Sequence, residues 1–397
     1  MAPVPTLRLS AFYFFYLAAL GVFSPYFPLW LDHQGLSAVA ISGMMSLWYG
    51  TRVVSPSAWG HLVLSSKRPI HWLRIGAALT VLAFAGFLWP QAPLVALVAV
   101  MAAFSFFYNA IMPQFEAVTL SHLAEAPHRY GRIRLWGSVG FLLTATALGP
   151  LFDRIGIGWL PWVMLPMFSL LLIAAFANDY GPAHRDDGPR ESLASSLRRP
   201  GVAALIGAGF LMQVAHGPYY VFFSLHLAEA GYSKGALGLF WAIGVLAEIV
   251  MFWFAARLLE RHGAVRLMRW CMAAAVLRFI ATALVPGSAL ALSIAQLGHA
   301  LTFGLFHSAG MRRTARLFPG RLLGQGQGLL YGLSSGLGGV TGALLAGQFW
   351  GLGGGRAAFL FAAVAAAAGL WLTLRAMQPG DAATRPRDLP LAGDEAS

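Results

Sequence analysis

The sequence predicts an all-α membrane protein whose transmembrane helices form two six-helix bundles. Of the 397 residues, 58% are hydrophobic and only 11% are charged, whereas soluble proteins carry about 25% charged residues. The apolar residues fall into about twelve runs, each long enough to cross a hydrocarbon core of roughly 30 Å. One long polar segment divides these runs into six and six. The first two observations predict the class and the third predicts the division.

The positions of the apolar runs give the expected spans. They are residues 9–31, 38–60, 72–90, 93–120, 134–152 and 159–177, then 201–228, 236–256, 270–286, 289–311, 324–349 and 356–377. Residues 178–200, rich in Pro, Gly, Ser and charge, are expected to be a cytoplasmic linker. It joins a first bundle, residues 1–177, to a second, residues 201–377. Residues 378–397 lack apolar periodicity and predict a disordered cytoplasmic tail.

The distribution of charge decides what the net charge of +12 means. With both termini in the cytoplasm, the inner loops and tails hold 22 of the 27 Lys and Arg residues. Such an asymmetry follows the positive-inside rule. We therefore expect a monomeric, multi-pass protein of the bacterial inner membrane with cytoplasmic termini. Its partners are the lipid bilayer and a small-molecule substrate, and nucleic acid is not expected. The single Cys271 excludes an internal disulfide framework.

The two halves resemble each other at a constant offset of 196 residues. The offset places Phe14 on Phe210, Gly21 on Gly217, Leu29 on Leu225, Gly35 on Gly231, Ser37 on Ser233 and Arg52 on Glu248. Repeated halves of this kind form transporters whose substrate site lies between the halves near the bilayer midplane.

Four charged residues fall deep within the predicted spans, away from their ends: Arg52, Glu116, Glu248 and Arg278. An ionised group in mid-bilayer costs at least about 2.5–3.5 kcal/mol, so such residues commonly mark a functional site. A structural ion pair between helices is the alternative, and an Arg can also extend toward the interface. Arg52 or Arg278 would attract an anion, while either acid could carry a proton.

Helical spacing predicts what surrounds the two acids. Glu116 shares a face with Asn109, and Glu248 shares one with Trp241 and Gly244. An aromatic or small neighbour suits the wall of a pocket. Burial in such dry surroundings favours the protonated carboxyl form, as proton coupling requires.

Three embedded histidines offer a second way to handle protons, because histidine titrates near neutral pH. His216 lies in the seventh span, and His299 and His307 are placed on one stripe of the tenth. A neutral histidine in helix packing is the alternative for each. The chain shows no cluster with metal-ligand spacing, and no metal or other cofactor is expected besides the proton.

The seventh span is unusually polar over VAHGPYYVFFSLHLAEAG, residues 214–231. Gln213, His216 and Tyr220 are expected on one stripe facing a central cavity, with Tyr219 beside them. The pair Gly217–Pro218 is expected to let the helix flex, and Gly21 would provide the same bend in the first half.

Three stretches carry a resemblance to a known family. They are YGRIRLWGSVGF (residues 130–141), AHGPYYVFFSLHLAEAGYSKGALGLFWAIGVLAEI (215–249) and GHALTFGLFHSAGMRR (298–313). Together with the twelve spans, they resemble the major facilitator superfamily. Within it they resemble the 3-phenylpropionate permease group of proton symporters, which is related to lactose permease.

The resemblance implies proton-coupled uptake by alternating access. It implies that Glu116, Glu248, Arg278 and His307 serve substrate binding and proton coupling, while Arg134 is expected to lie too shallow to take part. The family's loop motif GxxxDRxG is present in altered form as Ala256, Glu260, Arg261 and Gly263. Glu260 and Arg261 are therefore expected in a gating loop.

The leading prediction is a secondary transporter that takes up a small organic solute such as an aromatic carboxylate with protons. Alternatives are a proton-driven exporter of amphipathic compounds and a sugar or nucleoside symporter. A membrane-embedded enzyme is disfavoured, because no nucleophile–base or metal motif is present and the polar residues are spread over both halves.

Overall fold

The computed structural model describes residues 4–123, 126–181, 201–318 and 322–378. Within these residues the chain is almost entirely helical and has no strand, as predicted. The predicted linker from residue 182 and the predicted tail from residue 379 lie outside them. The first bundle contains α1 (Thr6–His33), α2 (Ala38–Ser65), α3 (Pro69–Ala85), α4 (Leu94–His122), α5 (Tyr130–Ile155) and α6 (Leu160–Phe176).

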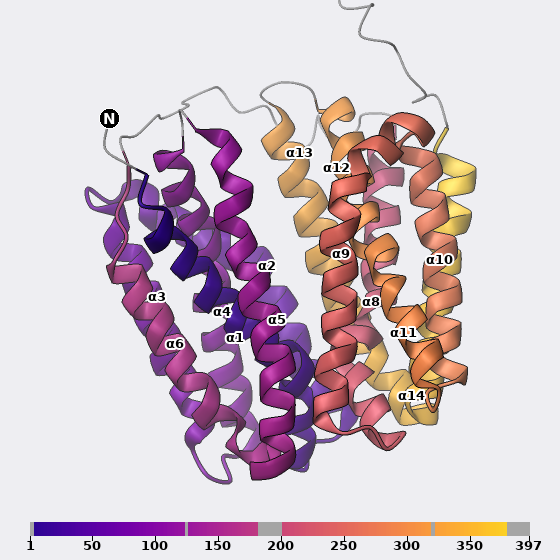
Figure 1. Cartoon of the computed structure of the whole chain (residues 1–397), viewed down its shortest axis with the longest axis horizontal. Helices are drawn as coiled ribbons and strands as arrows, with labels where there is room; N and C mark the ends of the chain where they lie inside the picture. The colour runs from indigo at the N-terminus through magenta and orange to yellow at the C-terminus, as the bar shows by residue number, and fades with distance from the viewer. Residues whose placement is uncertain (1–3, 124–125, 182–200, 319–321, 379–397) are drawn as a thin grey trace, which may run out of the picture.

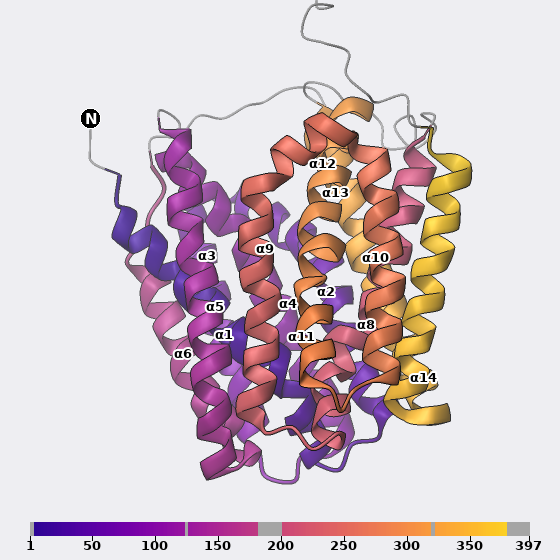
Figure 2. The same cartoon turned by 45° about the vertical axis from the view of Figure 1, so that its right-hand side comes forward.

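The second bundle has more interruptions than the first (Figures 1 and 2). It contains α8 (Val202–Glu229), α9 (Lys234–His262), α10 (Ala264–Leu284), α11 (Ala289–Leu297), α12 (Phe306–Leu317), α13 (Leu323–Leu329) and α14 (Gly338–Ala376). Two π-helical segments, η4 (Ala300–Leu305) and η6 (Leu330–Leu337), join α11 to α12 and α13 to α14. Short 3-10 turns are η1 (Gly86–Leu88), η2 (Pro127–Arg129) and η3 (Ile157–Trp159).

Twelve membrane crossings can be traced through the described residues. Ten segments are long and apolar enough to span a membrane. The helix α2 has 28 residues but is more polar, and it adds another. The last of the ten, Gly326–Ala376, has 51 residues and breaks at Gly353 and Gly354. There Gly354 has φ +60°, a left-handed conformation that favours glycine, and the chain turns back. That segment therefore makes two crossings.

The repeat read from the sequence is present in the backbone. Gly35 and Gly231 both have positive φ, at +78° and +92°. Two residues later, Ser37 and Ser233 cap α2 and α9, each accepting a hydrogen bond from the N–H three residues on, at 3.3 and 3.2 Å. The same residue types thus begin the second helix of both bundles.

The expected bend at Gly217 is replaced by a close helix crossing. The helix α8 continues through Gly217 and Pro218 without a break, and a Cβ at Gly217 would clash with the backbone of Gly342 in α14. Its repeat mate Gly21 approaches the backbone of Phe141 in α5 in the same way. Small residues allow such close packing where no hydrophobic effect drives helices together. Both glycines are packing positions.

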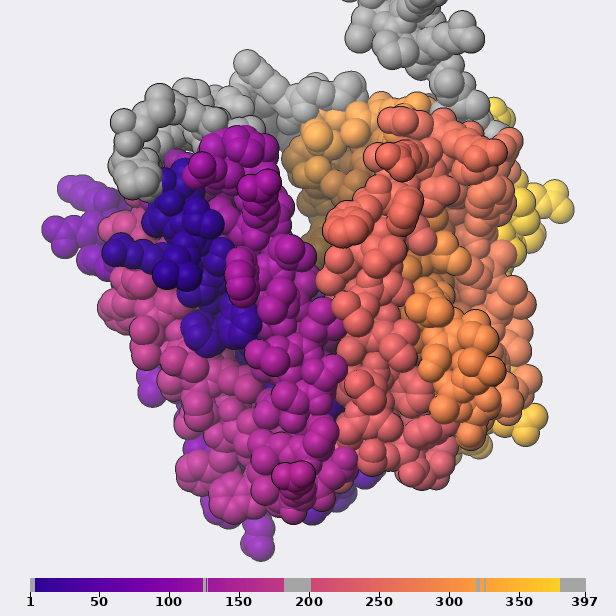
Figure 3. Space-filling model, in the orientation of Figure 1, coloured from indigo at the N-terminus to yellow at the C-terminus, as the bar shows by residue number. Residues whose placement is uncertain are grey.

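The two bundles touch at one end of the molecule and separate at the other. We call the end that holds residues 4 and 378 the terminal end, and the end where α1 finishes at His33 the far end. Toward the far end α5 packs on α9 and α14 packs on α2. At the terminal end the molecular surface is hollowed between the bundles (Figure 3).

The glycine crossing predicts a stability difference between two alanine variants. Gly217→Ala places a methyl group against the backbone of α14, which cannot move as a side chain could. We therefore expect the free energy of unfolding to fall by about 1–3 kcal/mol. Gly43→Ala is the matched control, because Gly43 is helical and has no atom within 4 Å of a Cβ. It should stay within about 1 kcal/mol of the parent. Thermal unfolding of the purified protein would measure both, and equal stability of the two variants would contradict the crossing.

Candidate functional site

Arg278 of α10 is the central polar residue of the second bundle, and it is only 4% exposed. A charge at this depth is costly unless its donors are occupied. Its guanidinium donates to Ala295 O (3.0 Å), Gln296 Oε1 (3.0 Å), Thr302 Oγ1 (3.1 Å) and His216 Nε2 (3.3 Å). The Tyr219 ring centroid lies 4.3 Å from Cζ. Arg278 is therefore satisfied by neutral groups and an aromatic face.

His216 lies inside this network and not on the cavity wall. It is 1% exposed, and its Nδ1 lies 2.8 Å from Met212 O. Because a guanidinium can only donate, His216 Nε2 must accept from Arg278, and the proton of the neutral imidazole sits on Nδ1. The expected contact between His216 and solute is thus corrected. The packing alternative fits, and the cause is the buried Arg278 beside it.

The neighbouring aromatic residues face in two directions. The Tyr219 hydroxyl accepts from Gln296 Nε2 at 3.2 Å, so Tyr219 also belongs to the interior. The Trp241 ring packs on it at 4.8 Å and donates to Ser224 Oγ at 3.0 Å. Tyr220 is only half-buried and its ring lies 6.5 Å from that of Tyr49 in α2. Of these rings, Tyr220 reaches the first bundle.

Gln213, the first residue of the predicted stripe, is half-buried one turn before His216. Its Cβ lies about 3.0 Å from the place of a Cβ on Gly338, so the side chain begins against α14.

Glu248 of α9 faces His299, the residue after Gly298 where α11 ends. Glu248 Oε2 lies 3.8 Å from His299 Nε2, and the carboxylate side chain is 17% exposed. This distance allows an ion pair but is too long for a direct hydrogen bond. His299 Nδ1 is buried without a partner among the described residues. Gly244 lies against the His299 ring, so the predicted small-residue face of Glu248 is the face that meets the histidine.

The π-helical segment η4 separates the two histidines that were predicted on one stripe. A π-helix adds a residue per turn and shifts the register of all that follows. His299 is 5% exposed and stacks on Phe303 at 5.3 Å, whereas His307 is exposed. The common stripe is therefore corrected. The same segment brings Thr302 to Arg278 and Gly304 to the side chain of Glu248.

Gln296 and Thr302 were not predicted as site residues. They are polar side chains in a mainly apolar tenth span, close in sequence to the predicted site residue His299. That polarity was the signal available in the sequence.

Arg52 of α2 differs from Arg278 in having no hydrogen-bond or ion-pair partner in the described part of the chain. It is half-buried near the middle of α2. Its Cζ lies 5.7 Å from the Trp48 ring centroid and 5.9 Å from that of Tyr49. Tyrosines of both bundles also lie in its surroundings, namely Tyr16, Tyr49, Tyr220 and Tyr331. Arg52 is thus a cation surrounded by aromatic side chains.

Asn109 of α4 is buried, and its amide holds α2 in place. Asn109 Nδ2 donates to Trp48 O and Thr51 Oγ1, each at 3.0 Å. It therefore supports the helical turn that directly precedes Arg52, and these bonds lie within the first bundle.

Glu116 is not in the dry surroundings expected from the sequence. Its side chain is 39% exposed and lies 3.9 Å from Arg134 Nε of α5, while the Tyr130 hydroxyl lies 3.4 Å away. Arg134 was expected to be too shallow to take part, but Glu116 itself is close to the terminal end of α4. The two residues therefore meet. Arg134 also has an electrostatic interaction with Glu248 in the other bundle.

Glu260 and Arg261, expected in a gating loop, form part of the last turn of α9. Both side chains are exposed at the terminal end.

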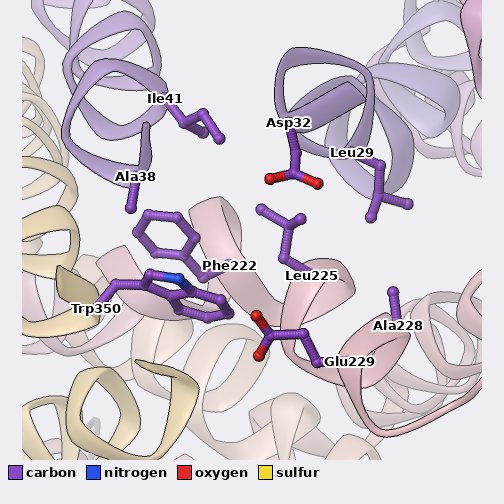
Figure 4. Close-up of a pocket in the computed structure, with 9 residues that line it drawn as sticks. All are labelled: Leu29, Asp32, Ala38, Ile41, Phe222, Leu225, Ala228, Glu229 and Trp350. Atoms are coloured by element: carbon purple, nitrogen blue, oxygen red, sulfur yellow. The ribbon is translucent and has the colours of Figure 1, made fainter. Parts of the chain in front are cut away.

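A cavity of about 310 Å³ lies between the bundles at the far end, away from the Glu248 cluster. Asp32 at the end of α1 and Glu229 at the end of α8 face each other across it (Figure 4). The rings of Phe222 and Trp350 form its floor.

Comparison with known proteins identifies the family. The model of the MFS_1 like family matches residues 6–361. The chain belongs to this family. It is thus a transporter of the major facilitator type and not an enzyme.

Two curated relatives differ in the solute that their names give. The chain is 30% identical to the "Probable 3-phenylpropionic acid transporter" of Escherichia coli (strain K12), over 76% of this chain and 80% of that protein. It is 28% identical to the "Maltose permease" of Geobacillus stearothermophilus, over 91% of this chain and 92% of that one.

Solved structures support the fold alone. A mutant of the nucleoside transporter NupG has a TM-score of 0.84 at 14% identity, covering 94% of this chain and all 100% of that chain. A bacterial homologue of the lysosomal transporter Spinster, described as inward-facing and occupied, has a TM-score of 0.69 at 15% identity, covering 94% and 96% of the two chains.

The two embedded arginines should differ in what they contribute to stability. Arg278→Gln leaves several buried acceptors without a donor, so we expect the free energy of unfolding to fall by about 3 kcal/mol or more. Arg52→Gln breaks no bond between described residues and should change stability by less than about 1 kcal/mol. Thermal unfolding of both purified variants checks this contrast. Equal destabilisation would show that Arg278 is not the structural cation.

Proposed function

We propose that the protein takes up a small aromatic carboxylate together with protons by alternating access. The observation that carries this proposal is Arg52. It is a permanently charged side chain near the middle of α2, with aromatic neighbours from both bundles and no carboxylate partner in the described chain. A solute that supplies both a carboxylate and a ring would satisfy the cation and stack on its surroundings.

Each part of this site has a distinct task in the proposal. Arg52 binds the carboxylate through its two-pronged guanidinium. Tyr49 of the first bundle and Tyr220 of the second, whose rings lie 6.5 Å apart, would both contact the ring, so the solute itself would join the two bundles. The relation to a protein named for 3-phenylpropionic acid supports this solute class.

Glu248 and His299 are proposed to carry the coupling proton. They stand 3.8 Å apart, with room for a water or a small shift to complete the bond. His216 is excluded from this task because Arg278 holds it as a neutral acceptor. His307, exposed and about two turns closer to the terminal end, would exchange the proton with solvent.

Arg134 connects the acids of the two bundles in this scheme. It pairs with Glu116 in its own bundle at 3.9 Å and interacts across the gap with Glu248. An ionised Glu248 attracts Arg134, whereas a protonated one does not. The protonation state of Glu248 thereby biases how closely the bundles approach at the terminal end.

The protein is proposed to lie in the bacterial inner membrane as a monomer with both termini in the cytoplasm. The excess of Lys and Arg in the loops of the terminal end supports this orientation. The hollow at that end (Figure 3) then opens to the cytoplasm. Glu260 and Arg261, exposed in the last turn of α9 at the same end, are proposed to take the gating role inferred from the family motif.

Uptake into membrane vesicles tests the function directly. With 3-phenylpropanoate as the solute, we expect the vesicles to accumulate it only when protons are more concentrated outside than inside. An uncoupler should abolish this accumulation. Accumulation that ignores both would contradict proton coupling. Uptake of maltose or a nucleoside in place of the carboxylate would contradict the solute class, and net proton-driven efflux of amphipathic compounds would contradict the direction.

Arg52 variants test carboxylate recognition. Arg52→Gln should weaken 3-phenylpropanoate binding by about 10- to 100-fold, because a charge-assisted bidentate contact is lost. Arg52→Lys keeps the charge without the planar fork and should recover part of the affinity. Isothermal titration of the purified protein measures both. The amide 3-phenylpropanamide is the matched ligand control, and it should bind the parent and Arg52→Gln equally.

Glu248→Gln separates coupling from binding. The amide mimics a permanently protonated carboxyl, so proton-driven accumulation should fall to the level without a gradient. Exchange of internal for external solute moves no net proton and should continue. A Glu248→Gln variant that still accumulates solute up a pH gradient would rule out Glu248 as the proton carrier.

A further inference from the structure

At the far end, a carboxylate of the first bundle binds the backbone of the second. Asp153 lies near the end of α5, and α9 begins at Lys234. Asp153 Oδ1 accepts from the Lys234 N–H and Oδ2 accepts from the Gly235 N–H, both at 2.9 Å. The Lys234 ammonium adds an ion pair at 3.6 Å.

These bonds complete the start of α9. The first four N–H groups of a helix lack partners within the helix itself. In α9 the first two bind Asp153, the third binds Ser233 Oγ at 3.2 Å, and the fourth, of Leu237, binds Ser233 O at 3.0 Å. The negative carboxylate also lies at the positive end of the helix dipole. The cap of α9 is therefore built from both bundles.

The equivalent helix of the first bundle is capped without outside help. At the start of α2, Ser37 binds the N–H groups of Ala40 and Ile41 in the same way. No described side chain of the second bundle accepts from Ala38 or Val39, the counterparts of Lys234 and Gly235. The carboxylate cap is thus an addition to the repeat and not part of what the two halves share.

Next to Asp153, the helices α5 and α9 are in direct contact. The Tyr26 hydroxyl of α1 lies 2.6 Å from Ala145 O and 3.3 Å from Lys234 O. A Cβ at Gly149 would clash with Lys234 O, and one at Gly238 would clash with Ala145 O. Here α5 and α9 pack backbone against backbone (Figure 1).

We propose that Asp153 is a positioning residue that holds the far end closed by capping α9. When the far end opens, α5 and α9 must separate, and the Lys234 and Gly235 N–H groups exchange the carboxylate for water. Loss of the cap therefore favours the state that is open at the far end. This inference rests on the alternating-access part of the proposed function, and it needs neither the solute nor the coupling ion.

Distances between spin labels at the far end test the proposal. Cysteines introduced at Trp159 and Leu290, which are 55% and 73% exposed on different bundles, would carry the labels. The buried native thiol would be removed by Cys271→Ala. In the parent, pulsed electron paramagnetic resonance should show mainly the short, closed distance. Asp153→Asn, which removes the charge and one acceptor, should change the closed-to-open ratio by about tenfold or more toward open.

Lys234→Pro gives an independent route if Asp153→Asn does not fold. Proline is favoured at the first position of a helix and lacks the N–H, and Ser233 already has the extended conformation that precedes proline (ψ 158°). It should shift the distances toward open. Lys234→Met keeps the N–H and removes only the ammonium, so its shift should be clearly smaller.

Glu229→Gln is the matched charge control, because it neutralises a carboxylate of the far end that caps no helix of the other bundle. It should cause no shift toward open. Parent-like distances in both Asp153→Asn and Lys234→Pro would overturn the proposal. If Lys234→Met or Glu229→Gln shifted the distances toward open as much as Asp153→Asn does, closure would depend on the overall charge of the far end and not on the cap. A failed uptake assay would leave these distances unaffected, so the two proposals can fail separately.

Discussion

The buried charge of Arg278 is the constraint around which the second bundle is organised. Lipid offers a guanidinium no hydrogen bonds, so the protein must supply every one. It does so with a carbonyl, an amide, a hydroxyl and an imidazole drawn from two other crossings, the seventh and the tenth. Meeting this need fixes the tautomer of His216 and the position of Tyr219. It also coincides with the π-helical turn η4, which presents Thr302 to the guanidinium. Gly304 of the same segment lies against the side chain of Glu248.

The two bundles share a backbone repeat but divide the chemistry unequally. The offset that aligns Ser37 with Ser233 also aligns Arg52 with Glu248, so one copy carries a cation where the other carries an acid. In the first bundle the cation has no bonding partner in the described chain, whereas in the second the acid faces a histidine. The proposed anion site and the proposed proton site thus occupy equivalent positions of the repeat, one in each bundle.

Most of the fold could be predicted from the sequence, because hydropathy and charge asymmetry are properties of whole segments. The candidate site could be predicted only in part. Arg52, Glu248 and Arg278 were found because charge is rare in lipid. The orientation of His216 could not be predicted, because it depends on Arg278 from another helix. The separation of His299 from His307 could not be predicted either, because spacing rules assume an unbroken α-helix. The pairing of Glu116 with Arg134 was missed because sequence gives depth only within a turn or two.

The backbone contact of Gly149 and Gly238 has a consequence for the energy supply of the cell. A membrane that stores a proton gradient loses it through any continuous file of water. Side chains pack with small gaps and change rotamer. Two backbones in direct contact leave no gap through which a file of water could pass. In the proposed proton-coupled cycle, this contact would close the path between α5 and α9 to water and protons while the terminal end stands open.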